Sequence, residues 1–140
     1  MYTTLVIDDD SQILHLCRVL LEREGYTVFA AATGDAGLEM CCNESIDLVI
    51  TDIIMPDKDG LETISEIKTQ FPEIRIVAMS GGGRLGPDSY LPLAKKLGAA
   101  DVLCKPFTRN ELLTVVEEQV RENTGGNKDK SITPTEETQN

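Results

Sequence analysis

The chain has 140 residues, of which 41% are hydrophobic and 26% charged, a composition that suits one globular domain with a sizeable core. Its net charge of −11 argues against a nucleic-acid surface, which needs clustered Lys and Arg. No apolar run approaches the ~20 residues that a membrane span requires, and the N-terminus lacks the basic flank of a signal peptide. The four cysteines form no CxxC pair and no His-Cys metal spacing, so we expect reduced thiols in a cytoplasmic protein.

Short apolar runs alternate with segments of helical periodicity along the chain. In order, these patterns predict elements at residues 4–7 (strand), 11–24 (helix), 27–31 (strand), 33–42 (helix), 48–52 (strand), 61–70 (helix), 74–79 (strand), 89–97 (helix), 101–104 (strand) and 108–122 (helix). Ser11 is expected to cap the first helix, and Gly25 to end it. We expect the domain to span residues 1–122, followed by a polar and disordered tail of residues 123–140.

Five successive strand–helix units predict an α/β fold in which helices cover both faces of a parallel sheet. The first strand has to lie centrally if both faces are to be covered. We therefore expect a doubly wound, flavodoxin-like (βα)5 three-layer sandwich with strand order 2-1-3-4-5.

Acidic residues end two neighbouring strands of this predicted sheet. Asp8 and Asp9 follow the first strand, and Asp52 ends the third. An Asp at such a place more often caps a helix or forms a turn, and Asp10 is expected to do so or to be exposed. The switch point of this strand order lies between strands 1 and 3, however, so these carboxylates should converge. Crowded carboxylates repel anions and suit Mg²⁺, which helps an Asp nucleophile to accept a phosphoryl group.

Two further side chains are expected at the same edge of the sheet. Lys105 directly follows the fifth apolar run, where an amine can pair with a carboxylate and then bind a phosphoryl oxygen. Pro106 follows it and suggests a cis peptide bond that directs the lysine inward. Ser80 offers a hydroxyl at the end of the fourth strand. The glycines after it do not fit the P-loop pattern.

These motifs together resemble the receiver domain of two-component response regulators, over about residues 3–122. The matching segments are IDDD, DIIMPDKDG, AMSGGG and LCKPF, each following its own predicted strand. Each segment alone is a weak signal, but four of them in order on five strand–helix units are highly specific. The resemblance implies a CheY-like protein that takes part in phosphorelay signal transduction.

The resemblance also implies a role for each residue of the site. Asp52 would be the phosphoacceptor and would take its phosphoryl group from a histidine kinase or a phosphotransfer protein. Asp9, Asp52 and the Ile54 backbone carbonyl would bind Mg²⁺ directly, and Asp8 through water. Ser80 and Lys105 would then bind the phosphoryl oxygens and switch the conformation.

The sequence departs from the family's pattern at one position. Family members often carry a Tyr or Phe three residues before the Lys, and this chain has Val102 there. Ile54 offers no polar group that could position an attacking water, so we expect slow loss of the phosphoryl group. The chain is expected to catalyse its own phosphotransfer and slow dephosphorylation without being an enzyme in the ordinary sense.

Other interpretations stay open from the sequence. A pseudo-receiver that only binds partners would be expected to have lost an acid, the Ser or the Lys, and this chain retains them all. An aspartate-nucleophile phosphatase would carry a second acid where Ile54 stands. We expect the chain to be either a stand-alone receiver or a part of a longer regulator. Its target is expected to be a protein rather than nucleic acid or a membrane, and its oligomeric state a monomer or a weak dimer.

Overall fold

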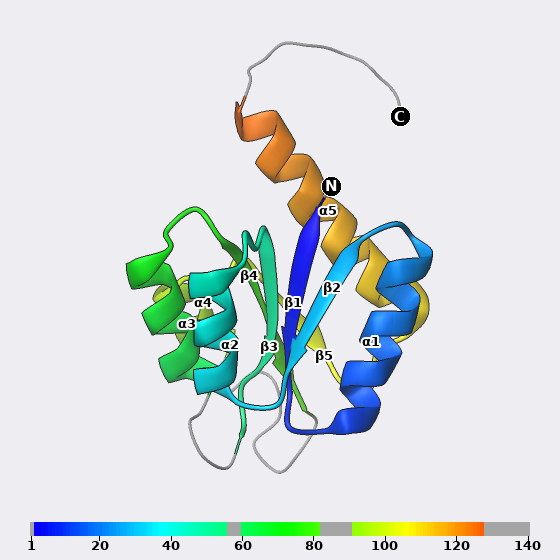
Figure 1. The fold of residues 1–140 in the computed structure, drawn as a ribbon, viewed down its shortest axis with the longest axis horizontal. Helices are drawn as coiled ribbons and strands as arrows, with labels where there is room; N and C mark the ends of the chain where they lie inside the picture. Colours follow the sequence, from blue (N-terminus) through cyan, green and yellow to red (C-terminus); the bar gives the residue numbers. More distant parts are fainter. Residues whose placement is uncertain (1, 56–59, 82–90, 128–140) are drawn as a thin grey trace.

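The computed structural model describes residues 2–55, 60–81 and 91–127. Within these ranges strands and helices alternate strictly along the chain (Figure 1). Their bounds are β1 (Thr3–Ile7), α1 (Ser11–Arg23), β2 (Thr27–Ala31), α2 (Gly34–Asn43), β3 (Leu48–Asp52), α3 (Gly60–Gln70), β4 (Arg75–Ser80), α4 (Leu91–Leu97), β5 (Asp101–Cys104) and α5 (Arg109–Asn127). No described helix is long and apolar enough to cross a membrane.

The strands form one parallel sheet in the order β2-β1-β3-β4-β5, which confirms the predicted doubly wound topology. β1 and β3 are neighbours, and Ile7 pairs with Thr51 at their carboxyl ends. The switch point of the fold therefore lies where the acidic residues were expected. Figure 1 shows α1 and α5 on one face of the sheet and α2, α3 and α4 on the other, the expected three layers.

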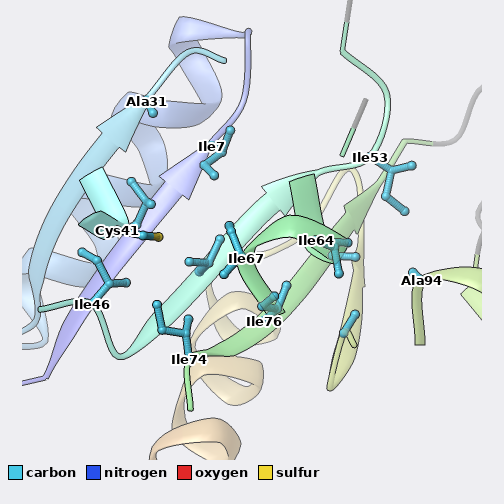
Figure 2. Packing of buried hydrophobic residues seen from close by; sticks show 14 of the residues in the cluster. Ile7, Ala31, Cys41, Ile46, Ile53, Ile64, Ile67, Ile74, Ile76 and Ala94 are labelled. Atoms are coloured by element: carbon cyan, nitrogen blue, oxygen red, sulfur yellow. The ribbon is translucent and has the colours of Figure 1, made fainter. Parts of the chain in front are cut away.

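The strands are buried on both faces, which explains why their sequences are almost continuously apolar. Alternate side chains of β1 enter different layers: Leu5 and Ile7 pack toward α2 and α3, whereas Val6 packs toward α1 and α5. On the first of these faces, fully buried Ile64 and Ile67 of α3 cover the sheet (Figure 2). Each helix is thus attached to the sheet through an apolar stripe of its own.

The N-cap of α1 lies one residue before Ser11, the predicted cap. Asp10 is the N-cap of α1 and accepts a hydrogen bond from the Gln12 N–H at 2.9 Å. The assignment of this role to Ser11 was therefore wrong, whereas the expectation that Asp10 caps a helix or is exposed is confirmed. Both residue types cap helices well, and the extended backbone of Asp10 decides between them. Gly25, at φ +93°, follows the end of α1 as predicted.

Several other boundaries differ from the sequence-based expectation, most of them by one residue. β4 includes Ser80, which pairs with Cys104 of β5, so the strand reaches one residue further than residues 74–79. α5 continues to Asn127, five residues beyond the predicted end at residue 122. A helix that has already formed gains one hydrogen bond with each added residue, and so it can extend into a polar segment. The predicted start of α4 at residue 89 and the tail from residue 128 lie outside the described residues.

Candidate functional site

The carboxyl ends of β1, β3 and β5 bring the predicted site residues together. Asp8 directly follows β1, Asp52 is the last residue of β3, and Lys105 directly follows β5. Asp8 is fully buried and Asp52 is 5% exposed, whereas Asp9 is exposed. The site thus has a buried floor and one carboxylate at its rim.

Lys105 joins the two buried carboxylates. Its Nζ lies 2.7 Å from Oδ2 of Asp8 and 3.2 Å from Oδ1 of Asp52. The other oxygen of Asp8 accepts a hydrogen bond from the Asp10 N–H at 2.9 Å. Both carboxylate oxygens of Asp8 are therefore bound, one by a cation and one by the backbone.

The ionisation of Asp52 reflects this environment. Burial raises its pKa to about 6, the nearby charge of Asp8 adds to the increase, and the Lys105 ammonium opposes it. Burial by itself would lower the pKa of Lys105, but the hydrogen bond to Asp8 and the charge of Asp52 outweigh that effect and raise it. Lys105 accordingly stays charged, and Asp52 is predominantly ionised at neutral pH.

The acidic residues also form a group that fits a cation. Asp8, Asp9 and Asp52 each offer an oxygen, and these oxygens all lie within 4.8 Å of one another. The three carboxylates outnumber the single Lys105 ammonium, so the site carries an excess of negative charge. Hard oxygen donors in small number, with one side open to water, are the set that Mg²⁺ prefers. The residues present therefore fit the expected metal.

Ser80 lies at the same edge of the sheet, at the end of β4. Its side chain is 2% exposed, and its Oγ donates a long hydrogen bond of 3.5 Å to the Gly81 carbonyl. Its own carbonyl accepts a hydrogen bond from the Lys105 N–H at 2.8 Å. The ends of β4 and β5 are thereby joined next to the acidic group. The Lys105–Pro106 peptide bond is cis, the conformation that the sequence predicted.

The remaining predicted positions are at the margin of the site. Ile54 follows β3 by two residues, and its side chain is 58% exposed. Val102 of β5 is half-buried and packs against the apolar cluster under α2, α3 and α4, with no aromatic ring in its place.

Sequence reasoning missed two backbone contacts of the site. Asp10 was expected only as a cap or an exposed residue, yet its N–H also holds Asp8. Gly60 opens α3 against the backbone of Asp52. A backbone donor has no signature in residue type, whereas a glycine placed eight residues after Asp52 could have suggested a close approach.

Comparisons with known proteins identify relatives over most of the chain. The sequence profile of the response regulator receiver domain matches residues 4–117. The transcriptional regulatory protein CpxR of Escherichia coli K12 is 36% identical over 113 residues, which are 81% of this chain and 47% of CpxR. The DNA-binding transcriptional regulator NtrC of Azospirillum brasilense is 36% identical over 122 residues, which are 87% of this chain and 25% of NtrC. The chain thus spans half or less of the length of these curated relatives.

Solved structures agree with the sequence relatives. A receiver domain protein from Clostridium thermocellum superposes with a TM-score of 0.80 at 34% identity, covering 89% of this chain and 98% of that one. A CheY-like receiver domain protein from Methanospirillum hungatei has a TM-score of 0.83 at 28% identity, with coverage of 90% and 98%. By its sequence and its fold, the chain belongs to the response regulator receiver domain family.

Proposed function

We propose that Asp52 accepts a phosphoryl group from the phosphohistidine of a histidine kinase or a phosphotransfer protein, in a Mg²⁺-dependent reaction. The observation that carries this proposal is the group of Asp8, Asp9 and Asp52 with the Lys105 ammonium between two of its members. This arrangement surrounds a nucleophile with groups that neutralise the charge of an incoming phosphoryl group.

The reaction needs an ionised Asp52. A pKa of about 6 leaves roughly nine tenths of the carboxylate deprotonated at pH 7 and gives it more basicity than an exposed Asp has. A carboxylate oxygen attacks phosphorus, the bond between phosphorus and the donor's imidazole nitrogen breaks, and the imidazole leaves with the electron pair. Mg²⁺, held by Asp9, Asp52 and the Ile54 carbonyl and through water by Asp8, would neutralise charge on the phosphoryl oxygens.

The same residues account for switching. The phosphoryl group adds charge and acceptor oxygens at the carboxyl end of β3. Lys105 can exchange its 3.2 Å contact with Asp52 for a phosphoryl oxygen, and the Ser80 hydroxyl has only a long hydrogen bond to give up. Their movement would favour one arrangement of the β4–α4 and β5 rim. Because Val102 has no ring to turn inward, this rim rather than an aromatic rotamer would carry the signal.

The output is proposed to be a protein partner in the cytoplasm. The relatives CpxR and NtrC are named as transcriptional regulators, and this chain matches only a part of each. The receiver would act either on a domain joined to it or on a separate protein, as a monomer or a weak dimer. It would turn over its own phosphoryl group slowly rather than act as an enzyme on a free substrate.

The test is the intact mass of the protein after incubation with a small acyl phosphate and Mg²⁺. We expect the wild-type chain to gain one phosphoryl group, and to gain none when the metal is chelated. Asp52→Asn should gain none in either condition. Asp10→Asn is the matched control, because it changes a neighbouring exposed charge and keeps a helix-capping side chain. A folded wild-type chain that stays unmodified with Mg²⁺ present would refute the proposal.

A further inference from the structure

Gly60, the first residue of α3, packs against the backbone of Asp52. A Cβ atom added to Gly60 in ideal geometry would stand 2.8 Å from the carbonyl carbon of Asp52 and 2.7 Å from the Cα of Ile53. It would lie closer still to the Asp52 carbonyl oxygen. These separations are well below the usual contact distance of about 3.5–4 Å between carbon atoms. Any side chain at position 60 therefore requires the chain around Asp52 to move.

The requirement concerns space rather than backbone conformation. The described glycines with positive φ are Gly25 and Gly98, so the φ of Gly60 is open to other residues. Gly37 and Gly98 are also crowded, but their nearest neighbours are the side chains of Ile7 and Lys68. Side chains can turn away from an added methyl group, whereas a backbone carbonyl moves only with its strand.

The backbone at Asp52 has little freedom to move, because neighbouring groups hold it from several sides. The Thr51 hydroxyl donates to the Asp52 carbonyl at 3.1 Å, and the Ile53 N–H donates to the Met79 carbonyl of β4 at 3.0 Å. Gly60 itself donates its N–H to the Ile53 carbonyl at 2.6 Å. The start of α3 and the end of β3 are thus fixed to each other through two consecutive peptide units.

We propose that Gly60 is a positioning residue for the Asp52 carboxylate, an inference that rests on the proposed phosphoacceptor role. Its missing side chain lets α3 begin directly on the Asp52 carbonyl. The carbonyl and the carboxylate belong to one residue, so a displaced backbone carries the carboxylate away from its 3.2 Å contact with Lys105 and from the acidic group. A misplacement of about 1 Å at a reacting group lowers a rate about 100-fold.

The experiment compares wild-type protein with Gly60→Ala and Gly98→Ala. Each is incubated with a small acyl phosphate over a series of Mg²⁺ concentrations, and the intact mass is followed in time beside urea unfolding. Gly98→Ala is the control, because it adds the same methyl group to a crowded glycine remote from the site. At φ +129° this alanine is also strained by its backbone conformation, so the control loses stability without a change at the acceptor. Partial unfolding lowers the observed rate only by the folded fraction, which urea unfolding measures, whereas misplacement of the acceptor lowers the rate constant of the folded molecules.

For Gly60→Ala we expect a rate constant about 100-fold lower and a higher half-saturating Mg²⁺ concentration. For Gly98→Ala we expect both values to match the wild type, even where urea unfolds it earlier. Wild-type values for folded Gly60→Ala, or an equal loss of rate in both variants, would overturn the inference.

A second variant covers the case in which Gly60→Ala does not fold. Thr51→Val keeps the side-chain volume and removes the hydroxyl that holds the Asp52 carbonyl from the other side. We expect about a fivefold lower rate constant, the equivalent of one neutral hydrogen bond, and an unchanged rate would then overturn the inference. A wild-type chain that gains no phosphoryl group contradicts the proposed function instead. In that case the half-saturating Mg²⁺ concentration is measured by direct titration. A higher value for Gly60→Ala than for the wild type supports the positioning role of Gly60, and an equal value overturns it.

Discussion

At the scale of single residues, the ionisation of Asp52 opposes folding when no cation is bound. Its pKa lies near 3.8 in an unfolded chain and rises to about 6 in the folded protein, through burial first and then through Asp8. A carboxyl with a raised folded pKa stabilises the fold below its unfolded pKa, and this contribution is lost as the pH rises through the folded pKa. The difference between the two pKa values corresponds to about 3 kcal/mol of unfolding free energy, which is lost between about pH 4 and pH 6.

Asp52→Asn should therefore stabilise the metal-free protein at high pH. We expect its free energy of unfolding at pH 8 to exceed that of the wild type by up to about 3 kcal/mol, and the two to differ little at pH 4. Urea unfolding at both pH values, with a chelator present, measures this difference. Added Mg²⁺ should stabilise the wild type and leave the variant nearly unchanged, because a cation binds the folded carboxylates. A variant that is less stable than the wild type at pH 8 would contradict the expected destabilising charge.

Ile54 should control how long the phosphoryl group survives. Its exposed side chain stands two residues beyond Asp52 and has no atom that can orient a water molecule for attack. We expect Ile54→Gln, which adds a donor and an acceptor at similar length, to shorten the lifetime of the phosphorylated protein about tenfold or more. Loss of phosphoryl mass after removal of the donor measures this lifetime, and Ile54→Leu serves as the apolar control. A wild-type lifetime of only seconds would contradict the argument.

At the scale of elements, Asp10 connects the start of α1 to the site. Its carboxylate caps α1, and its N–H binds Asp8. Asp10→Ala removes the cap together with the charge, whereas Asp10→Asn removes the charge and keeps a capping side chain. We expect the first to lower the free energy of unfolding by about 1 kcal/mol and the second to stay within a few tenths. Urea unfolding of the pair measures the cap separately from the charge. Equal destabilisation by Ala and Asn would show that the charge, and not the cap, carries the effect.

The elements that the sequence predicted are those with a strong periodic signal. β2 and β5 have their predicted bounds, because their apolar runs are short and end at turn residues. The convergence of Asp8, Asp52 and Lys105 could be predicted as well, since each ends or directly follows an apolar run and parallel strands bring such ends together. The bridge from Lys105 to both carboxylates was not predictable in this detail, because it depends on the separation of β1, β3 and β5 in space.

The errors arose where neighbouring residues have similar propensities or where the sequence becomes polar before the helix ends. Asp10 and Ser11 are both good caps, and residue type alone does not decide between them. The last turn of α5 is polar, so its sequence resembles a tail. The contact between Gly60 and Asp52 is made by two backbones, so the only trace of it in the sequence is the glycine itself.

At the scale of the whole molecule, α5 ties the end of the domain to β4, the strand beside the central one. Figure 1 shows α5 extending past the sheet at the end opposite the acidic site. Arg75, at the start of β4, donates to Gln119 at 2.9 Å and forms an ion pair with Glu122. Gln119 is 2% exposed, so its side chain belongs to the interior although it is polar. The turns of α5 up to residue 122 are thus part of the domain's own packing.

Truncation tests where the domain ends. A chain that stops after residue 122 keeps both contacts of Arg75, and we expect its free energy of unfolding to lie within about 0.5 kcal/mol of that of the full chain. A chain that stops after residue 117 loses Gln119 and leaves Arg75 without these two partners. We expect it to be less stable by about 2–3 kcal/mol, the usual cost of removing a hydrogen bond to a charged group.

Urea unfolding of the two truncated chains beside the full chain measures both differences, and Arg75→Met in the full chain separates the contacts of Arg75 from the loss of helix. If removal of residues 123–140 alone destabilised the protein by several kcal/mol, the domain boundary expected at residue 122 would be wrong. In that case the last turn of α5 would hold the fold together through contacts of its own. Because Arg75 lies at the opposite end of β4 from Ser80, we expect neither truncation at residue 122 nor Arg75→Met to change the rate of phosphorylation of the folded protein.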